Sequence, residues 1–406
     1  QDFLKAYPND PSNDRVLYQL ARAQEQSGDL ETSLKTLDQL VARYPNTAYR
    51  DEAQFRRGEL LFSLKDYARA ERAYATVLGT QHRTEFNDRA LYMQGWSRFK
   101  QAKLEEGLQS FFAVLDGKLA NRGDEPLDTL PGLTRGDREL VEDTFRVMSI
   151  SLTNLQGAES IPTYVKDDTR KSYEFRVYQD LGELYIKQDR VKDAADTFSL
   201  FVKRNPMHAQ APVLQARVID IFEGGGFATL ALDAKREYVG RYGVASEFRK
   251  ANPEGWNKAQ PLVKTRLSEL ARHYHASAQK TKATSDYQEA VRWYRDIITG
   301  FPGEPDTARN HFLLGELLYE DSRFAEAAVE YEKTAYSYPL HEKSADAGYA
   351  ALLAYAEQDK RAAAADKPKL QLAGVQSSLR SHISEAAQFD DITLLFVRRS
   401  PVAAAA

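Results

Sequence analysis

GELLYEDSRFAEAAVEYEKTAYSYP, residues 315–339, decides the fold of this chain. Gly315 is followed twelve residues later by Ala327, four further on by the aromatic Tyr331, and eight after that by Pro339. Several such landmarks also repeat at an offset of 37 residues, and a fixed period of this size predicts a stack of similar units. The same spacing recurs at Gly58–Ala70–Tyr74, Gly95–Gly107–Phe111 and Gly182–Ala194–Phe198–Pro206.

Each unit is predicted to be a pair of amphipathic helices. In the unit that contains Gly58, the expected helices are 52–64 and 67–78. Gly58 and Ala70 are expected where the two helices cross, and Tyr74 is expected to fill the space toward the next unit. Proline ends the second helix because it lacks an N–H donor and restricts the residue before it. Helix pairs are expected at 13–45, 51–82, 88–119, 174–206, 209–242, 263–302 and 308–339.

The spacing predicts an all-α fold, an α-solenoid of antiparallel helix pairs, in four segments. Residues 1–119 hold the N-terminal units, the first of them truncated, and 174–357 hold the C-terminal units. Residues 120–173 combine a loop rich in Gly, Pro and Asp with a degenerate repeat helix at 137–155. Residues 358–406 are a linker and a tail, in which 390–397 read as one strand.

Two smaller features are expected within the units. The unit 263–302 is expected to have a long inter-helix loop at 279–285, and Gly224-Gly225-Gly226 is expected to be a turn between helices. The glycines are not expected to hold a phosphate, because no strand precedes them and no Gly-Lys-Ser/Thr follows.

Composition excludes several classes of function. The chain has 406 residues with a net charge of −4, which gives no basic footprint for nucleic acid. There is no cysteine, so disulfides, thiolate metal sites and a cysteine nucleophile are excluded. No apolar run reaches the roughly 18–20 residues that span a bilayer.

No constellation of catalytic residues is recognisable in the sequence. His273 and His275 are two residues apart, which puts them on opposite faces of a helix and argues against a shared metal ion. No Ser/His/Asp or Cys/His set is present either. We therefore expect no enzymatic activity and no cofactor.

The Gly/Ala/aromatic/Pro spacing resembles the tetratricopeptide repeat (TPR) family over residues 13–119 and 174–357. Units that close in Tyr44-Pro45, Phe301-Pro302 or Tyr338-Pro339 look more narrowly like the TPR scaffold and adaptor lipoproteins of the Gram-negative envelope. That resemblance implies protein or peptide partners and a periplasmic or outer-membrane-associated location, with a cytoplasmic one as the alternative. Gln1 lies within a truncated first repeat. Any lipid anchor is therefore expected upstream of Gln1.

The tail AQFDDITLLFVRR, residues 387–399, resembles the C-terminal strand of PP2C-like serine phosphatases, in which the first Asp of the motif helps to hold a catalytic metal. Only this last fragment of that family is present, and one carboxylate cluster does not make a two-metal site. Phosphatase activity is therefore not expected of this chain. A regulatory TPR region of such a phosphatase remains an alternative to a scaffold, as does a structural subunit of a larger assembly.

The resemblance implies that the first helix of each unit lines a concave, partner-binding face. Tyr92, Trp96 and Phe99 are spaced four and three residues apart, which puts three rings on one face of a helix. Such a stripe either anchors a partner or packs against the neighbouring helix, and both interpretations stay open. The expected partner-binding residues are Tyr18, Arg22, Phe55, Glu59, Tyr92, Trp96, Phe99, Gln179, Glu183, Phe312 and Glu316.

Overall fold

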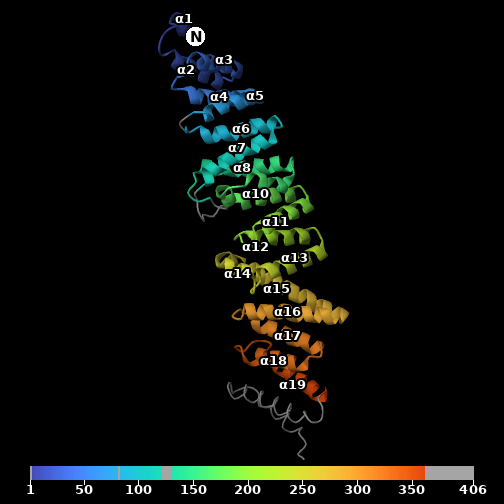
Figure 1. Cartoon of the computed structure of the whole chain (residues 1–406). Helices are drawn as coiled ribbons and strands as arrows, with labels where there is room; N and C mark the ends of the chain where they lie inside the picture. Colours follow the sequence, from blue (N-terminus) through green and yellow to red (C-terminus); the bar gives the residue numbers. More distant parts are fainter. Residues whose placement is uncertain (1, 81–82, 121–129, 362–406) are drawn as a thin grey trace, which may run out of the picture. The chain divides into compact units, whose positions relative to one another are not determined.

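The computed structural model describes residues 2–80, 83–120 and 130–361, and all regular structure in these ranges is helical (Figure 1). The predicted all-α class is confirmed. The tail helix and the strand expected at 390–397 lie outside the described residues. The chain divides into two compact units, Gln1–Pro206 with Asp220–Gly226, and Met207–Ile219 with Phe227–Ala406.

The first unit contains helices α1 to α11. Its helices are α1 (Asp2–Ala6), α2 (Asn13–Gln26), α3 (Leu30–Arg43), α4 (Arg50–Ser63), α5 (Tyr67–Leu78), α6 (Asn87–Lys100), α7 (Leu104–Leu119), α8 (Arg135–Thr153), the 3-10 helix η1 (Gly157–Ser160), α9 (Ile161–Tyr164), α10 (Asp168–Lys187) and α11 (Val191–Arg204).

The second unit contains helices α13 to α19, and α12 contributes residues to both units. These helices are α12 (Ala211–Gly224), α13 (Ala228–Tyr242), α14 (Glu247–Ala251), α15 (Pro253–Thr281), α16 (Thr284–Gly300), α17 (Thr307–Glu320), α18 (Phe324–Tyr336) and α19 (Ser344–Arg361).

Most helices pack as the repeat spacing predicts. In the first unit α2 packs on α3, α4 on α5, α6 on α7 and α10 on α11. In the second unit α15 packs on α16 and α17 on α18. The exception is α8, which is followed only by η1 and the four-residue α9. Because its second helix is this short, α8 packs directly against both α7 and α10.

The turn between paired helices has one recurring geometry. Lys65 has a left-handed backbone with φ of 65°, and the next N–H, of Asp66, donates to the carbonyl of Leu61 at 2.8 Å. This bond closes the end of α4, and the Asp66 carboxylate then caps α5 by accepting from the Arg69 N–H at 3.1 Å. The same left-handed position is occupied by Gly28, Lys65, Ala102, Asp189, Gly226 and Ser322.

The small residues of the repeat make room for an aromatic ring within the same helix pair. A Cβ added to Gly95 would lie 2.5 Å from the ring of Phe111, and one added to Gly58 would lie 2.5 Å from the ring of Tyr74. Gly315 stands in the same relation to Tyr331. The expectation that Tyr74 fills the space toward the next unit is therefore corrected: its ring covers the glycine of its own partner helix.

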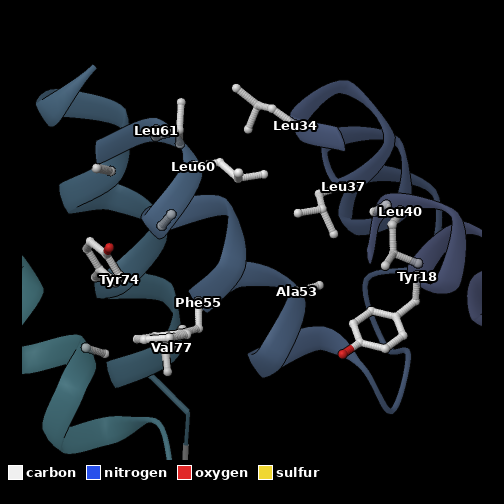
Figure 2. Close-up of a cluster of buried hydrophobic side chains, with 14 of the residues drawn as sticks. Tyr18, Leu34, Leu37, Leu40, Ala53, Phe55, Leu60, Leu61, Tyr74 and Val77 are labelled. Carbon is white, nitrogen blue, oxygen red and sulfur yellow. The ribbon is translucent and has the colours of Figure 1, made fainter. Parts of the chain in front are cut away.

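These contacts build a continuous core in the first unit. Figure 2 shows Tyr18 of α2, Leu37 and Leu40 of α3, Phe55 of α4 and Tyr74 of α5 among the buried side chains. Each is close to fully buried, so successive helix pairs share one apolar layer. The core fixes the helices, and their remaining faces carry polar and half-buried residues.

Two boundaries differ from the expectation. The long loop expected at 279–285 is absent: α15 continues to Thr281, and only residues 282–283 separate it from α16. Lys282 adopts a left-handed conformation that ends the helix. At its other end α15 begins at Pro253, where the Asn252 side chain accepts from the Gly255 N–H at 2.8 Å, and it runs through Pro261. The helix expected at 137–155 is α8, Arg135–Thr153.

Candidate functional site

The aromatic stripe predicted on α6 is formed in the structure. The Tyr92 and Trp96 ring centroids are 6.5 Å apart, and those of Trp96 and Phe99 are 5.4 Å apart in an edge-to-face arrangement. All three residues are half-buried. The Lys100 ammonium lies 5.7 Å from the Trp96 ring centroid. The ring contacts account for the packing interpretation, and partner binding by the stripe stays a prediction.

Tyr92 connects the stripe to α8. One side of its ring packs 6.1 Å from the ring of Phe111, and its hydroxyl donates to the carboxylate of Asp143. Asp143 also pairs with Arg146 on the same helix. The stripe thus ends at a group of charged side chains that α8 presents beside α6.

A hollow of about 660 Å³ lies next to this group, between α8 and α10. It exists because the short α9 leaves these two helices packed side by side. Most of the residues that line it carry a charged side chain, and both signs of charge are present. The lining residues are Arg138, Glu139, Glu142, Asp143, Arg146, Ser149, Asp180, Glu183, Leu184 and Lys187.

Arg176 of α10 links the two helices that border the hollow. Its side chain is only 6% exposed and pairs with Glu142 at 3.0 Å and with Asp180 at 3.3 Å. Its guanidinium also lies 5.0 Å from the ring centroid of Phe145. Burial raises the pKa of Asp180 above its usual range, although the charge of Arg176 opposes the rise. A cation shared by two carboxylates fixes the spacing of α8 and α10.

Sequence reasoning missed most of this hollow. Only Glu183 was among the predicted residues, because Arg176, Glu142 and Asp143 belong to helices that flank or lie in the segment without the repeat spacing. A usable signal was present: Glu139, Asp143 and Arg146 recur at helical spacing along the polar face of α8.

Two predicted site residues are core residues instead. Tyr18 is 3% exposed and stacks on Tyr49 at 4.6 Å, and Phe55 is 6% exposed between Tyr74 and Phe86. Packing between successive helix pairs buries both rings. Neither ring is therefore accessible to a partner. Arg22 remains half-buried, with its guanidinium 5.9 Å from the Tyr18 ring centroid.

The predicted glutamates of α4 and α17 have a structural partner. Glu59 accepts a hydrogen bond from the Tyr74 hydroxyl, and Glu316 accepts one from Tyr331, both at 2.6 Å. In each case the glutamate directly follows the glycine that the tyrosine ring covers. The hydrogen bond therefore fixes the tyrosine ring against the helix that carries the glycine. Gln179 on α10 and Phe312 on α17 are half-buried, and the Phe312 ring centroid is 5.7 Å from that of Tyr331.

Tyr92 of α6 contacts Asp143 of α8, and Asp143 lines the same hollow as Glu183 of α10. We call the surface formed by Tyr92, Trp96, Phe99, Asp143 and Glu183 the α6–α10 face. Phe312 and Glu316 belong to the second unit and form no part of it. The face offers exposed ring edges beside a charged hollow, which suits recognition of a polypeptide that has both apolar and charged side chains.

The described residues show no arrangement for metal chemistry. Within them, no three His, Asp or Glu side chains are grouped closely enough to hold an ion. His275 is buried with its Nδ1 3.1 Å from the Tyr294 hydroxyl, whereas His273 on the same helix is exposed. The two histidines therefore face different surroundings, as their spacing predicts.

Two segments of the chain match a model of a known protein family. Residues 18–82 and 282–347 match a family model described as tetratricopeptide repeat. No curated protein matches the sequence.

Several solved structures are similar at low identity. A hetero-tetramer of Cut9 and Hcn1 from the APC/C is 13% identical, with 96% of this chain and 90% of that chain covered and a TM-score of 0.33. The C-terminal part of a TPR repeat-containing protein from Cytophaga hutchinsonii is 13% identical, with 72% and 98% covered and a TM-score of 0.30. A tetratricopeptide repeat protein from Parabacteroides merdae is 11% identical, with 84% and 98% covered and a TM-score of 0.28. Because these scores are low, nothing about partners follows from them.

Proposed function

We propose that this chain, which carries tetratricopeptide repeats in residues 18–82 and 282–347, is a non-catalytic scaffold or adaptor that binds partner proteins or peptides on the α6–α10 face. The observation that carries the proposal is the α6 stripe. Three adjoining, half-buried rings form an aromatic surface that a partner can cover. Aromatic anchors beside charged groups are the residues that dominate binding energy at protein interfaces.

Site-specific photo-crosslinking tests the location of this face. A photoreactive amino acid placed at Phe99 is expected to capture partner proteins from a lysate of the source cells. The same group placed at Tyr349, an exposed aromatic residue of α19, serves as the control. Capture that is equal at both positions contradicts the proposal.

A matched pair of variants measures the contribution of the stripe. Trp96→Ala is expected to weaken binding of a captured partner by about 2 kcal/mol or more, a typical value for a buried aromatic anchor. Tyr349→Ala is expected to leave binding unchanged. Binding that survives Trp96→Ala in a folded variant removes the α6–α10 face from the proposal.

We further propose that the scaffold acts in a bacterial envelope complex, in the periplasm or at the outer membrane, with any lipid anchor carried upstream of Gln1. The support is the resemblance of the Tyr-Pro and Phe-Pro unit ends to envelope TPR lipoproteins. None of the described helices is both long and apolar enough to cross a bilayer. Fractionation of source cells tests the location, and recovery of the native protein in the cytoplasmic fraction overturns it.

The regulatory alternative rests on residues 387–399, outside the described residues. Its test is turnover of a phosphopeptide by the full chain with Mn²⁺, for which no activity is expected. Activity that is lost in Asp390→Asn would favour a phosphatase remnant over a scaffold.

A further inference from the structure

A second hollow, of about 520 Å³, lies on the second unit, where α15 and α17 face each other across α16. Its floor is made by Tyr294 and Ile297 of α16, each only 2% exposed. Its walls carry polar and basic side chains from the two flanking helices. The lining residues are Pro261, Lys264, Thr265, Ser268, Arg272, Tyr294, Ile297, Asp306, Arg309, Asn310 and Leu313.

The basic groups of this hollow are not neutralised within it. Lys264 pairs with Glu304 at 2.6 Å, but Arg272 and Arg309 have no carboxylate partner among the described residues. The Arg272 Nε donates only to the main-chain carbonyl of Ser268, at 3.2 Å.

Both arginines act on the same point of the floor. Burial raises the pKa of the Tyr294 hydroxyl to about 12, and the positive charges of Arg272 and Arg309 oppose that rise from opposite helices. Both arginines line the same hollow as the tyrosine, Arg272 from α15 and Arg309 from α17. The Tyr294 hydroxyl is held in place by His275, whose Nδ1 is 3.1 Å away.

The polar residues of the walls add one more donor. The hydroxyls of Thr265 and Ser268 donate back to main-chain carbonyls of α15, at 3.0 and 2.9 Å. The Asn310 side-chain amide has no hydrogen-bond partner in the described part of the chain. Two guanidinium groups and an amide thus line one concave surface, and carboxylate oxygens are good acceptors for such donors.

We propose that this hollow binds an acidic segment of a partner protein, with Arg272 and Arg309 pairing with its Asp or Glu side chains. This rests on the proposed scaffold function and specifies the chemistry of one of its partners. The α15–α17 hollow is separate from the α6–α10 face, because the two belong to different compact units.

An acidic peptide fits this hollow better than a nucleic acid does. Nucleic acids are held by a series of Lys and Arg contacts along the phosphate backbone. Here two free arginines stand in one pocket, Asp306 lines its rim, and the whole chain has a net charge of −4. Local positive charge on an acidic protein favours a short acidic motif over a polyanion.

Selection of a random peptide library on the full chain tests the proposal. Peptides enriched on the wild-type protein are expected to contain more Asp and Glu than the input library. The Arg272→Gln/Arg309→Gln double variant is expected to lose this enrichment. The matched control is Arg50→Gln/Arg72→Gln, in which two arginines of the first unit are replaced. Neither forms an ion pair with another described residue.

The affinity of a selected acidic peptide gives the quantitative test. Fluorescence anisotropy is expected to show about tenfold weaker binding, or a larger loss, for the double variant, because two charge-assisted hydrogen-bonding groups are removed. The Gln-for-Glu version of the peptide is expected to show a similar loss on the wild-type chain. Far-UV circular dichroism checks that the double variant keeps its helices.

Three results would overturn the proposal. One is a selection without acidic enrichment, another is unchanged affinity in the double variant, and the third is equal binding of a single-stranded oligonucleotide. If enriched peptides are not acidic but depend on Trp96, the scaffold function stands and only the α15–α17 inference fails. If Phe99 captures no partner and no peptide is enriched at all, the scaffold function fails with it.

Discussion

At the scale of single residues, the glycines under aromatic rings carry the clearest consequence for stability. Gly95→Ala places a methyl group 2.5 Å from the nearest ring atom of Phe111, so α6 and α7 must separate or the ring must leave its site. We expect the free energy of unfolding to fall by about 1–3 kcal/mol, as for other overpacked cores. Urea denaturation measures the change.

Gly240→Ala is the matched control for this substitution. Gly240 lies within α13, and a Cβ there meets no atom within 4 Å. Alanine is the better helix former by about 0.8–1 kcal/mol, so this variant is expected to be more stable than wild type. Equal effects of the two substitutions would show that packing against the ring is not what selects glycine at residue 95.

Glu71 of α5 gives a prediction for pH. Burial alone would raise its pKa, but hydrogen bonds from Lys103, Arg98 and Gln101 outweigh that effect and lower the pKa from 4.5 to about 2. The folded state therefore favours the carboxylate, and the resulting stabilisation, about 3 kcal/mol at most, is present above pH 4.5 and is lost as pH falls toward 2.

The measurement is the difference in melting temperature between wild type and Glu71→Gln at several pH values. The difference is expected to be large at pH 7 and to shrink steadily below about pH 4.5. Glu139→Gln, at an exposed residue of α8, is the control and is expected to change little. A pH-independent difference for Glu71→Gln contradicts the inferred pKa.

At the scale of helices and turns, the left-handed position between paired helices predicts a stabilising change. Ala102 has φ of 61°, a conformation that costs an L-residue roughly 1–2 kcal/mol and that glycine adopts freely. Ala102→Gly is expected to raise the free energy of unfolding by about 0.5–1 kcal/mol after the greater chain entropy of glycine is deducted.

Gly28→Ala tests the same position in reverse. Gly28 has φ of 83°, and no atom lies within 4 Å of an added Cβ, so any loss of stability reflects the backbone alone. We expect a loss of roughly 1 kcal/mol by chemical denaturation. Changes of the same sign in both variants would contradict the assignment of strain to this turn.

The helices also show which parts of the fold a sequence can specify. The spacing of Gly58 and Tyr74 predicted the paired helices, because small residues and rings must alternate wherever two helices cross closely. The spacing did not predict which residue the Tyr74 ring contacts. Helical spacing shows which side chains share a face of a helix, but it does not show what packs against that face. The helix pair expected to start at residue 263 starts earlier, because α15 begins at Pro253 after the Asn252 cap.

The candidate site was predictable only where it follows the repeat. The rings of α6 share a face because four and three residues bring side chains onto one side of a helix, whatever surrounds them. The hollow between α8 and α10 arises because α9 is short. The repeat spacing does not predict a short helix at this position. Tyr18 and Phe55 were misplaced for a related reason: burial depends on Tyr49 and Phe86, which come from the next helix pair.

At the scale of the whole molecule, stacked repeats predict that a local loss of stability stays local. In such proteins each helix pair interacts mainly with its neighbours, so the effect of a substitution decays along the chain. The three tryptophans are suitable reporters: Trp96 lies in the first compact unit, and Trp256 and Trp293 lie in the second. Gly95→Ala is expected to lower the unfolding midpoint reported by Trp96 more than the midpoint reported by the other two.

Two tryptophan backgrounds separate these signals. Trp96→Phe leaves only the reporters of the second unit, and the Trp256→Phe/Trp293→Phe variant leaves only Trp96. With Gly95→Ala added to each, intrinsic fluorescence in increasing urea is expected to show a large shift of the midpoint in the second background and a smaller shift in the first. Identical shifts in both would mean that the chain unfolds as one cooperative body, in which case a partner bound at the α6–α10 face would also stabilise the α15–α17 hollow.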